Sequence, residues 1–277
     1  MKITVLIDNS KGADPELVAE HGLSLYIEVG EWSILCDMGA SGLFAGNAAK
    51  LGIELGKTDF AFISHGHNDH AGGLKSFFDT CPDKRVYLSG QIMTSQYFST
   101  RRGFKRDISP DFTTMNSNRD RLIPLFESCR ITPEIAFVHP DCSTFAVPYG
   151  NSFLYSSEVG STNVYLDNFQ HEFALAIYTP KGLVIVAPCS HCGAANIIQA
   201  AKQYTGIDRV CAYIGGLHFV DSDVVEKEVD TFVRDFYLVA PEAQLYTGHC
   251  TGDIAKEFLS KSMPDVKLIS TGLVIEI

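Results

Sequence analysis

Short apolar runs alternate with amphipathic stretches over the first ninety residues. Gly30-Glu31 separates two of the apolar runs and predicts a two-residue hairpin turn. The spacing of apolar side chains predicts short helices over residues 43–51 and 71–78. The runs of strand length are residues 3–7, 23–29, 33–36, 60–63 and 86–88.

The same alternation returns after residue 173. Pro180-Lys181-Gly182 predicts a second hairpin turn. Hairpins and helical connections within one chain favour a mixed α/β architecture. Strands are predicted over residues 173–178, 183–187, 210–214, 244–246 and 266–277, and helices over residues 194–204, 225–236 and 254–260.

Residues 91–160 lack a clear period and carry scattered proline and serine. Because no linker-like composition brackets them, we predict an irregular inserted segment and not a separate domain. The expected organisation is therefore a single domain over residues 1–277.

Composition narrows the class of protein. The 277 residues are 45% hydrophobic and 20% charged, and 33 Asp and Glu against 22 Lys and Arg give a net charge of −11. We expect such an acidic chain to be a poor nucleic-acid binder and to act on a small-molecule substrate. The substrate can still be anionic, because a bound metal cluster creates local positive charge.

No apolar run reaches the length of a membrane span or of a signal peptide. The eight cysteines lack the spacing of secreted disulfide proteins, so we expect a cytoplasmic protein with mostly reduced thiols. Oligomeric state stays open.

A dense group of metal-binding side chains follows the predicted strand 60–63. His65, His67, Asp69 and His70 fall within six residues of one another. Imidazole and carboxylate groups suit zinc, manganese and iron. A metal site is a far better explanation of this group than a polar loop of solvated histidines.

Three further histidines occupy the same position relative to a predicted strand. His191, His218 and His249 each lie in a loop just past an apolar run. Such loops expose side chains on a rigid scaffold and can bring distant segments to one site. His218 has four open roles: metal ligand, general acid, substrate contact or buried structural histidine. His171, with Glu172 beside it, is an intermediate case, because it precedes a predicted strand instead of following one.

Residues 64–73, Ser-His-Gly-His-Asn-Asp-His-Ala-Gly-Gly, resemble the His-x-His-x-Asp-His signature of the metallo-β-lactamase superfamily. Asp37 matches the upstream strand-end aspartate of that superfamily. A closer resemblance is to the dihydropterin–ribofuranosylaminobenzene phosphate synthase branch. The matching segments of this branch are residues 8–9, 21–24, 189–191, 215–218 and 249–252. The resemblance implies an α/β fold of the αββα type, a four-layer sandwich of two mixed sheets flanked by helices.

The resemblance also implies a site that holds one or two divalent metal ions, with zinc preferred and manganese or iron as alternatives. Superfamily members place a bridging aspartate where this chain has His191, so the number of metals stays open. Asp69, which would ligate a second metal or orient the nucleophile, and His218, a candidate acid for the leaving group, are the expected catalytic residues. No residues are assigned to an organic cofactor. The expected metal ligands are His65, His67, Asp69, His70, His191 and His249.

Asp37 has two open interpretations. It accepts a hydrogen bond from a ligand imidazole, or it is a turn residue before Gly39.

These features predict a metal-dependent hydrolase. A metal-bound hydroxide would attack a small anionic substrate such as a phosphoester, a phosphodiester or a lactone. One alternative is a pterin-related transferase or synthase, as the closer resemblance implies. Another is a metal-binding module without catalytic activity.

Two smaller features have alternative explanations. Cys189 and Cys192 form a C-x-x-C around His191, and we expect structural thiols, with thiolate ligation by Cys189 or Cys250 as the alternative. Four aromatic residues either line a substrate pocket or pack in the core, and core packing is the preferred interpretation. They are Tyr149, Phe153, Tyr155 and Tyr165.

Overall fold

The computed structural model describes all residues, 1–277, in two compact units. Unit 1 contains Met1–Phe126, Phe153–His171 and Ser270–Ile277, and unit 2 contains Glu127–Ser152 and Glu172–Ile269. The expectation of a single domain stays a prediction.

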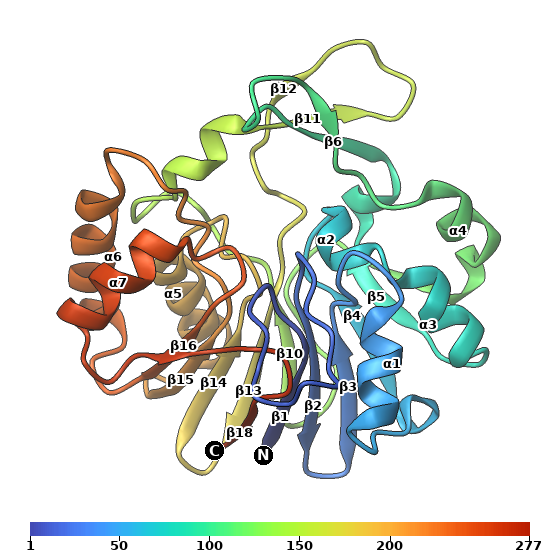
Figure 1. Cartoon of the computed structure of the whole chain (residues 1–277), viewed down its shortest axis with the longest axis horizontal. Coiled ribbons are helices and arrows are strands. Elements are labelled where there is room, and N and C mark those ends of the chain that lie inside the picture. Colours follow the sequence, from blue (N-terminus) through green and yellow to red (C-terminus); the bar gives the residue numbers. More distant parts are fainter. The chain divides into compact units, whose positions relative to one another are not determined.

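Unit 1 is built on a seven-stranded mixed sheet (Figure 1). Pairing is antiparallel from β18 to β3 and parallel from β3 to β8, and the predicted hairpin turn at Gly30-Glu31 is confirmed. In sheet order the strands are β18 (Val274–Glu276), β1 (Lys2–Ile7), β2 (Ser24–Val29), β3 (Trp32–Cys36), β4 (Phe60–Ile63), β5 (Val86–Ser89) and β8 (Leu122–Leu125).

Helices α1 (Leu43–Lys50) and α3 (Leu74–Thr80) cover one face of this sheet. Alternate strand residues, such as Leu35 and Ile63, pack against Phe44 and Phe77 of these helices, and all four are fully buried. All of β4 is buried on both faces, which explains its uninterrupted apolar sequence. The short helix α2 (Asn68–Ala71) lies between β4 and α3 along the chain.

A second sheet of unit 1 has four short strands in the order β12 (Tyr165–Leu166), β11 (Leu154–Glu158), β6 (Ser95–Ser99) and β7 (Arg106–Asp107). The segment 91–160 also contains α4 (Phe112–Ser117) and contributes β8 to the main sheet of unit 1. Its elements are too short to show a period in the sequence. The 3₁₀ turns of the chain are Leu55–Lys57, Gly90–Met93, Arg119–Arg121 and Tyr149–Phe153.

Unit 2 is built on its own seven-stranded mixed sheet. In order, the strands are β9 (Cys129–Arg130), β10 (Ile135–Val138), β13 (Ala174–Thr179), β14 (Gly182–Val186), β15 (Val210–Ile214), β16 (Gln244–Thr247) and β17 (Lys267–Leu268). Three antiparallel pairings are followed by three parallel ones, as in unit 1. The helices are α5 (Ala194–Thr205), α6 (Val225–Val239) and α7 (Asp253–Ser262), drawn in the yellow-to-red part of Figure 1.

The mixed α/β prediction is confirmed. The prediction of one continuous strand over residues 266–277 is wrong, because the chain turns at Thr271-Gly272 between β17 and β18. Gly272 has φ +87°, a conformation that L side chains rarely adopt. No helix has both the length and the apolar character needed to cross a membrane.

Candidate metal centre

The side chains of chemical interest follow the parallel strands of each sheet. Asp37 follows β3 and His65 lies two residues past β4, while the loops after β14, β15 and β16 carry His191, His218 and His249. Asp37, His218 and His249 adopt positive φ angles of 58°, 50° and 47°. Residues other than glycine keep such a backbone only where the surroundings enforce it, and these positions cluster at functional sites.

The four predicted residues of the dense group come together in unit 1. The His65 ring centroid lies 4.6 Å from that of His67 and 4.2 Å from that of His70, and all three rings are buried. Asp69, on α2, has an Oδ2 atom 3.8 Å from Nε2 of His70. Three imidazoles and a carboxylate in this arrangement match the donor chemistry of a zinc, manganese or iron site.

Asp37 is the residue that orients this group. Its Oδ2 accepts a 2.6 Å hydrogen bond from Nδ1 of His70, and its two oxygens accept bonds from the N–H and the hydroxyl of Ser64, both at 2.7 Å. An ionised carboxylate only accepts hydrogen bonds, so His70 carries its proton on Nδ1 and directs the lone pair of Nε2 away from Asp37. Asp37 therefore accepts a hydrogen bond from an imidazole, as one of its two interpretations expects, and the role of His70 as a metal ligand stays a prediction.

His171 supports the same loop, and one of its ring nitrogens lies within 4.8 Å of donor atoms of His67 and Asp167. Its Nδ1 accepts a 3.0 Å hydrogen bond from the N–H of Gly66, and its Nε2 donates a 3.0 Å bond to Asp167. Burial acts to raise the pKa of Asp167, but the hydrogen bonds from His171 and from the backbone N–H of Phe169 are among the contacts that lower it below its usual value. Both ring nitrogens of His171 are therefore engaged in holding the loop.

The ring of Tyr97 packs against this loop and against His171. Its ring lies 4.3 Å from that of His171, and a Cβ on Gly66 would meet Tyr97 Cε2 at 2.2 Å. Burial is the main cause that raises the pKa of Tyr97, so the phenol stays protonated. The sequence offers no signal for Tyr97, because it lies on β6 in the segment without a clear period.

His21 is a second residue that sequence reasoning missed. Its Nε2 lies 3.3 Å from Oδ2 of Asp69 although the ring is well exposed. The match of residues 21–24 to the synthase branch was the available signal.

In unit 2, His191 is held on both sides. Asn151 accepts from Nδ1 of the ring at 3.1 Å and donates to the His191 carbonyl at 2.8 Å. Glu172 accepts the backbone N–H groups of His191 and Cys192, at 2.8 and 2.7 Å, with one carboxylate oxygen each. Its carboxylate thus fixes the loop and is not directed outward as a ligand. Neither role could be read from the sequence, since Asn151 and Glu172 lie 40 and 19 residues from His191.

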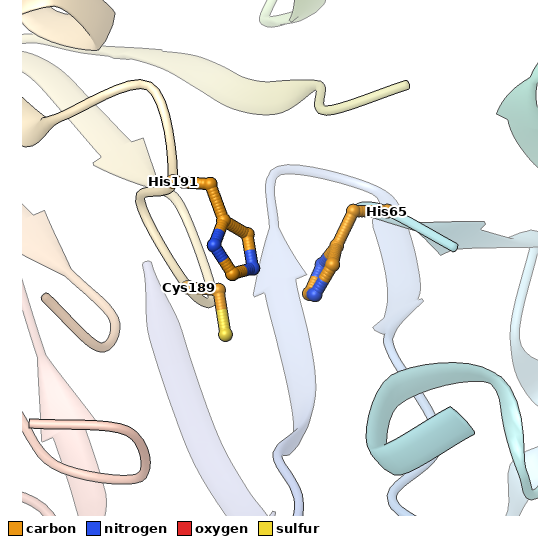
Figure 2. Close-up of side chains that lie close together, drawn as sticks. All are labelled: His65, Cys189 and His191. Carbon is orange, nitrogen blue, oxygen red and sulfur yellow. The ribbon is translucent and has the colours of Figure 1, made fainter. Parts of the chain in front are cut away.

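The sulfur atoms of two cysteines lie close to the histidines of unit 2. Figure 2 shows Cys189 and His191 on one loop, with the sulfur and the ring on the same side, and draws His65 at its own strand end. Cys189 Sγ lies within 4.8 Å of a ring nitrogen of His191 and of one of His249. It also lies 3.4 Å from Cys250 Sγ, which accepts the N–H of His218. Thiolate ligation by Cys189 therefore has the geometry it needs.

Cys192 is not a thiol in this structure. It forms a disulfide with Cys142, 50 residues upstream, whereas the other six cysteines are free. Cys189 is a free cysteine and its role stays open, whereas the prediction of a thiol is wrong for Cys192. Its partner lies in the segment 91–160, and the spacing of the cysteines gave no indication of the pair.

His218 packs against His191, with ring centroids 4.2 Å apart. A Cβ on the neighbouring Gly150 would meet Nδ1 of His218 at 2.8 Å, so glycine is needed there for the close approach. This contact places the candidate acid beside a candidate ligand within unit 2.

Comparison with known proteins agrees with this geometry. Residues 18–144 match the sequence model of the metallo-beta-lactamase superfamily. The chain is 29% identical to the 7,8-dihydropterin-6-methyl-4-(β-D-ribofuranosyl)-aminobenzene-5'-phosphate synthase of Methanocaldococcus jannaschii, over 100% of this chain and 96% of the relative.

Solved structures show the same fold. The crystal structure of Tm1679, described as a metal-dependent hydrolase of the β-lactamase superfamily, is 28% identical and has a TM-score of 0.80, with 100% of this chain and 99% of that one covered. YhfI of Bacillus subtilis, a metallo-β-lactamase fold protein, is 14% identical with a TM-score of 0.57 and coverage of 100% and 99%. The chain therefore has the metallo-β-lactamase fold, and its residues 18–144 are similar in sequence to the metallo-beta-lactamase superfamily.

Proposed function

We propose that this protein is a metal-dependent hydrolase of a small, anionic ester. The proposed metal ligands are His65, His67, Asp69 and His70 of unit 1 and His191 and His249 of unit 2, with zinc as the preferred ion. Cys189 is an additional candidate ligand.

One observation carries the proposal: the candidate ligands are oriented by buried hydrogen-bond partners. Asp37 binds Nδ1 of His70, and Asn151 binds Nδ1 of His191. In each ring a proton on Nδ1 leaves the lone pair on Nε2, the atom that would bind a metal, and such a partner is the usual arrangement for metal-binding histidines.

The side chains of this chain would divide the chemistry. A bound dication would polarise the ester or phosphoryl oxygen and make water more acidic. The Asp69 carboxylate, with its side chain 16% exposed, would hold the attacking water and accept its proton. His218 would donate a proton to the leaving group, and its backbone is held in place by the bond to Cys250.

A second candidate function follows from the relative in Methanocaldococcus jannaschii. That protein is named as a synthase, and its similarity extends over the full length of this chain. A pterin-related transferase would use the same ligands but would join two substrates in place of adding water.

Metal content tests the site first. Protein purified without added metal should contain at least one equivalent of transition metal by mass spectrometry. The double variant His65→Ala/His67→Ala should lose most of it, whereas His139→Ala, whose ring packs on Phe173, should not. Unchanged metal content in the double variant would refute the ligand assignment.

Activity then separates the functions. The metal-loaded protein should hydrolyse at least one of bis(p-nitrophenyl) phosphate, p-nitrophenyl phosphate and a homoserine lactone. Condensation of a pterin diphosphate with ribofuranosylaminobenzene phosphate, without ester hydrolysis, would favour the synthase. A fully metallated protein that is inert in both assays would indicate a module that binds metal only.

A further inference from the structure

Unit 2 contains a pocket of about 290 Å³ that none of the roles above uses. The walls are mostly apolar and include Leu217, Phe219 and Phe232, which are almost fully buried. The volume is at the lower end for small-molecule sites, so it suits one or two rings and not a large ligand. Tyr149, one of the aromatic residues expected in the core, is 44% exposed and lines this pocket.

One face of α6 forms a wall of the pocket. Glu228, Thr231, Phe232 and Asp235 follow one another at helical spacing and all line it. Lys227 of the same helix also lines the pocket, so its charged residues are one lysine and two acids. The two acids differ in their contacts. Asp235 accepts a 2.9 Å hydrogen bond from Nε of Arg234.

Glu228 is the acid of which one carboxylate oxygen accepts no hydrogen bond. Its Oε1 accepts the N–H of Tyr149 at 2.6 Å, whereas Oε2 is buried and accepts no hydrogen bond. Burial raises the pKa of this carboxyl group, and the bond from Tyr149 only partly offsets the effect. A cationic group beside this carboxylate would compensate for its lost hydration.

The pocket adjoins the candidate acid. Leu217 and Phe219 flank His218 in the chain, and Gly193 lies two residues past His191. The pocket therefore lies next to the backbone of both loops, although neither His191 nor His218 is among its lining residues.

We propose that this pocket binds an apolar ring system that bears an ammonium group, with the rings against Phe219 and Phe232 and the ammonium paired with the Glu228 carboxylate. Resting on the proposed function, the assignment makes the substrate an anionic ester that also carries a hydrophobic amine. The pocket then selects the substrate, while the metal ligands act on the ester.

The test is fluorescence titration of the metal-loaded protein with three probes of one shape. 1-Naphthalenemethylamine carries the ammonium, 1-naphthalenemethanol a neutral donor and 1-naphthoate an anion. The ammonium probe should bind about tenfold more tightly than the alcohol, as a charge-assisted hydrogen bond predicts. The anion should bind most weakly of the three.

Two variants locate the site. Glu228→Gln keeps the acceptor for Tyr149 but removes the charge, so it should abolish the preference for the ammonium probe. Glu226→Gln, an exposed acid on the same helix, is the matched control and should preserve that preference. Ala146→Trp, at an exposed lining residue, should weaken all three probes by filling the pocket.

Equal affinities of the three probes, no binding, or an ammonium preference that survives in Glu228→Gln would overturn the proposal. The variant His65→Ala/His67→Ala separates it from the proposed hydrolase, because that variant should lose hydrolysis but keep probe binding. Hydrolysis without probe binding would refute the pocket alone, and probe binding without metal or hydrolysis would refute the hydrolase alone.

Discussion

The carboxylate of Asp37 lies 2.6 Å from Nδ1 of His70, and both side chains are fully buried. Replacing Asp37 with Asn keeps the shape but allows the amide to present a donor to the ring. We expect metal affinity to fall about 10- to 100-fold, the usual effect of losing the partner of a ligand histidine. Competition with a chromogenic chelator measures the change.

Asp79→Asn is the matched control for Asp37→Asn. Asp79 is an exposed acid of the same unit that pairs with Lys75. Its replacement should leave metal affinity unchanged. Equal affinities of the wild type and Asp37→Asn would contradict the orienting role.

Glu172→Gln should destabilise the loop that carries His191. Each carboxylate oxygen of Glu172 accepts one backbone N–H, and the variant replaces one of these oxygens with an NH₂ group. One backbone N–H then faces a donor and loses its acceptor. A buried donor without an acceptor costs about 1–3 kcal/mol, which urea unfolding can resolve. Glu242→Gln, in an exposed pair with Arg209, should change stability by less than about 1 kcal/mol. Similar losses in both variants would disprove the special role of Glu172.

Gly66→Ala and Gly46→Ala should have opposite effects. At Gly66 a Cβ would lie 2.2 Å from the Tyr97 ring, so we expect a loss of about 1–3 kcal/mol from overpacking. At Gly46, in α1, a Cβ meets nothing within 4 Å, and the higher helix propensity of Ala should add up to about 1 kcal/mol. If the Tyr97 ring is the cause, Gly66→Ala should cost less in a Tyr97→Leu background, which a double-mutant cycle measures.

Thiol counting tests the disulfide. Denatured, non-reduced protein should react at six cysteines, and Cys142→Ser should raise the number to seven by releasing Cys192. The Cys129→Ser control should lower it to five. Eight reactive thiols in the wild type would show that Cys142 and Cys192 are not bonded.

The carboxyl group of Glu228 should make the stability of the protein depend on pH. Burial raises its pKa above the usual 4.5, against the effect of the Tyr149 N–H, so the native state binds this proton more tightly than the unfolded chain does. Its contribution to stability is complete below the unfolded pKa and is lost as the pH rises through the native pKa. Relative to Glu228→Gln, the unfolding midpoint of the wild type should therefore decline as the pH rises above 4.5, the usual pKa of the group. A difference that is constant with pH would contradict the shift.

Local patterns predicted the parts of the site that are close in sequence. The apolar run of β4 and the residues His65 to His70 lie next to each other, so strand and ligands could be inferred together. His191 and His249 were found because each follows a strand, a rule that the parallel ends of β14 and β16 obey.

The residues that hold these ligands could not be inferred in the same way. Asn151, Glu172 and Tyr97 act across long sequence separations, and their types occur throughout ordinary loops and strands. Pairing of short strands in the segment 91–160 depends on tertiary contacts that leave no period in the sequence.

The pairing of β1 with β18 has a consequence for the order of folding. Thr4 pairs with Val274 and Lys2 with Glu276, so this contact joins residues at least 270 positions apart in sequence. Closing so long a stretch of chain costs conformational entropy before the pairing adds any stability. The edge of the unit 1 sheet that β18 forms is therefore expected to be completed late in folding, after β1 has paired with its close neighbour β2.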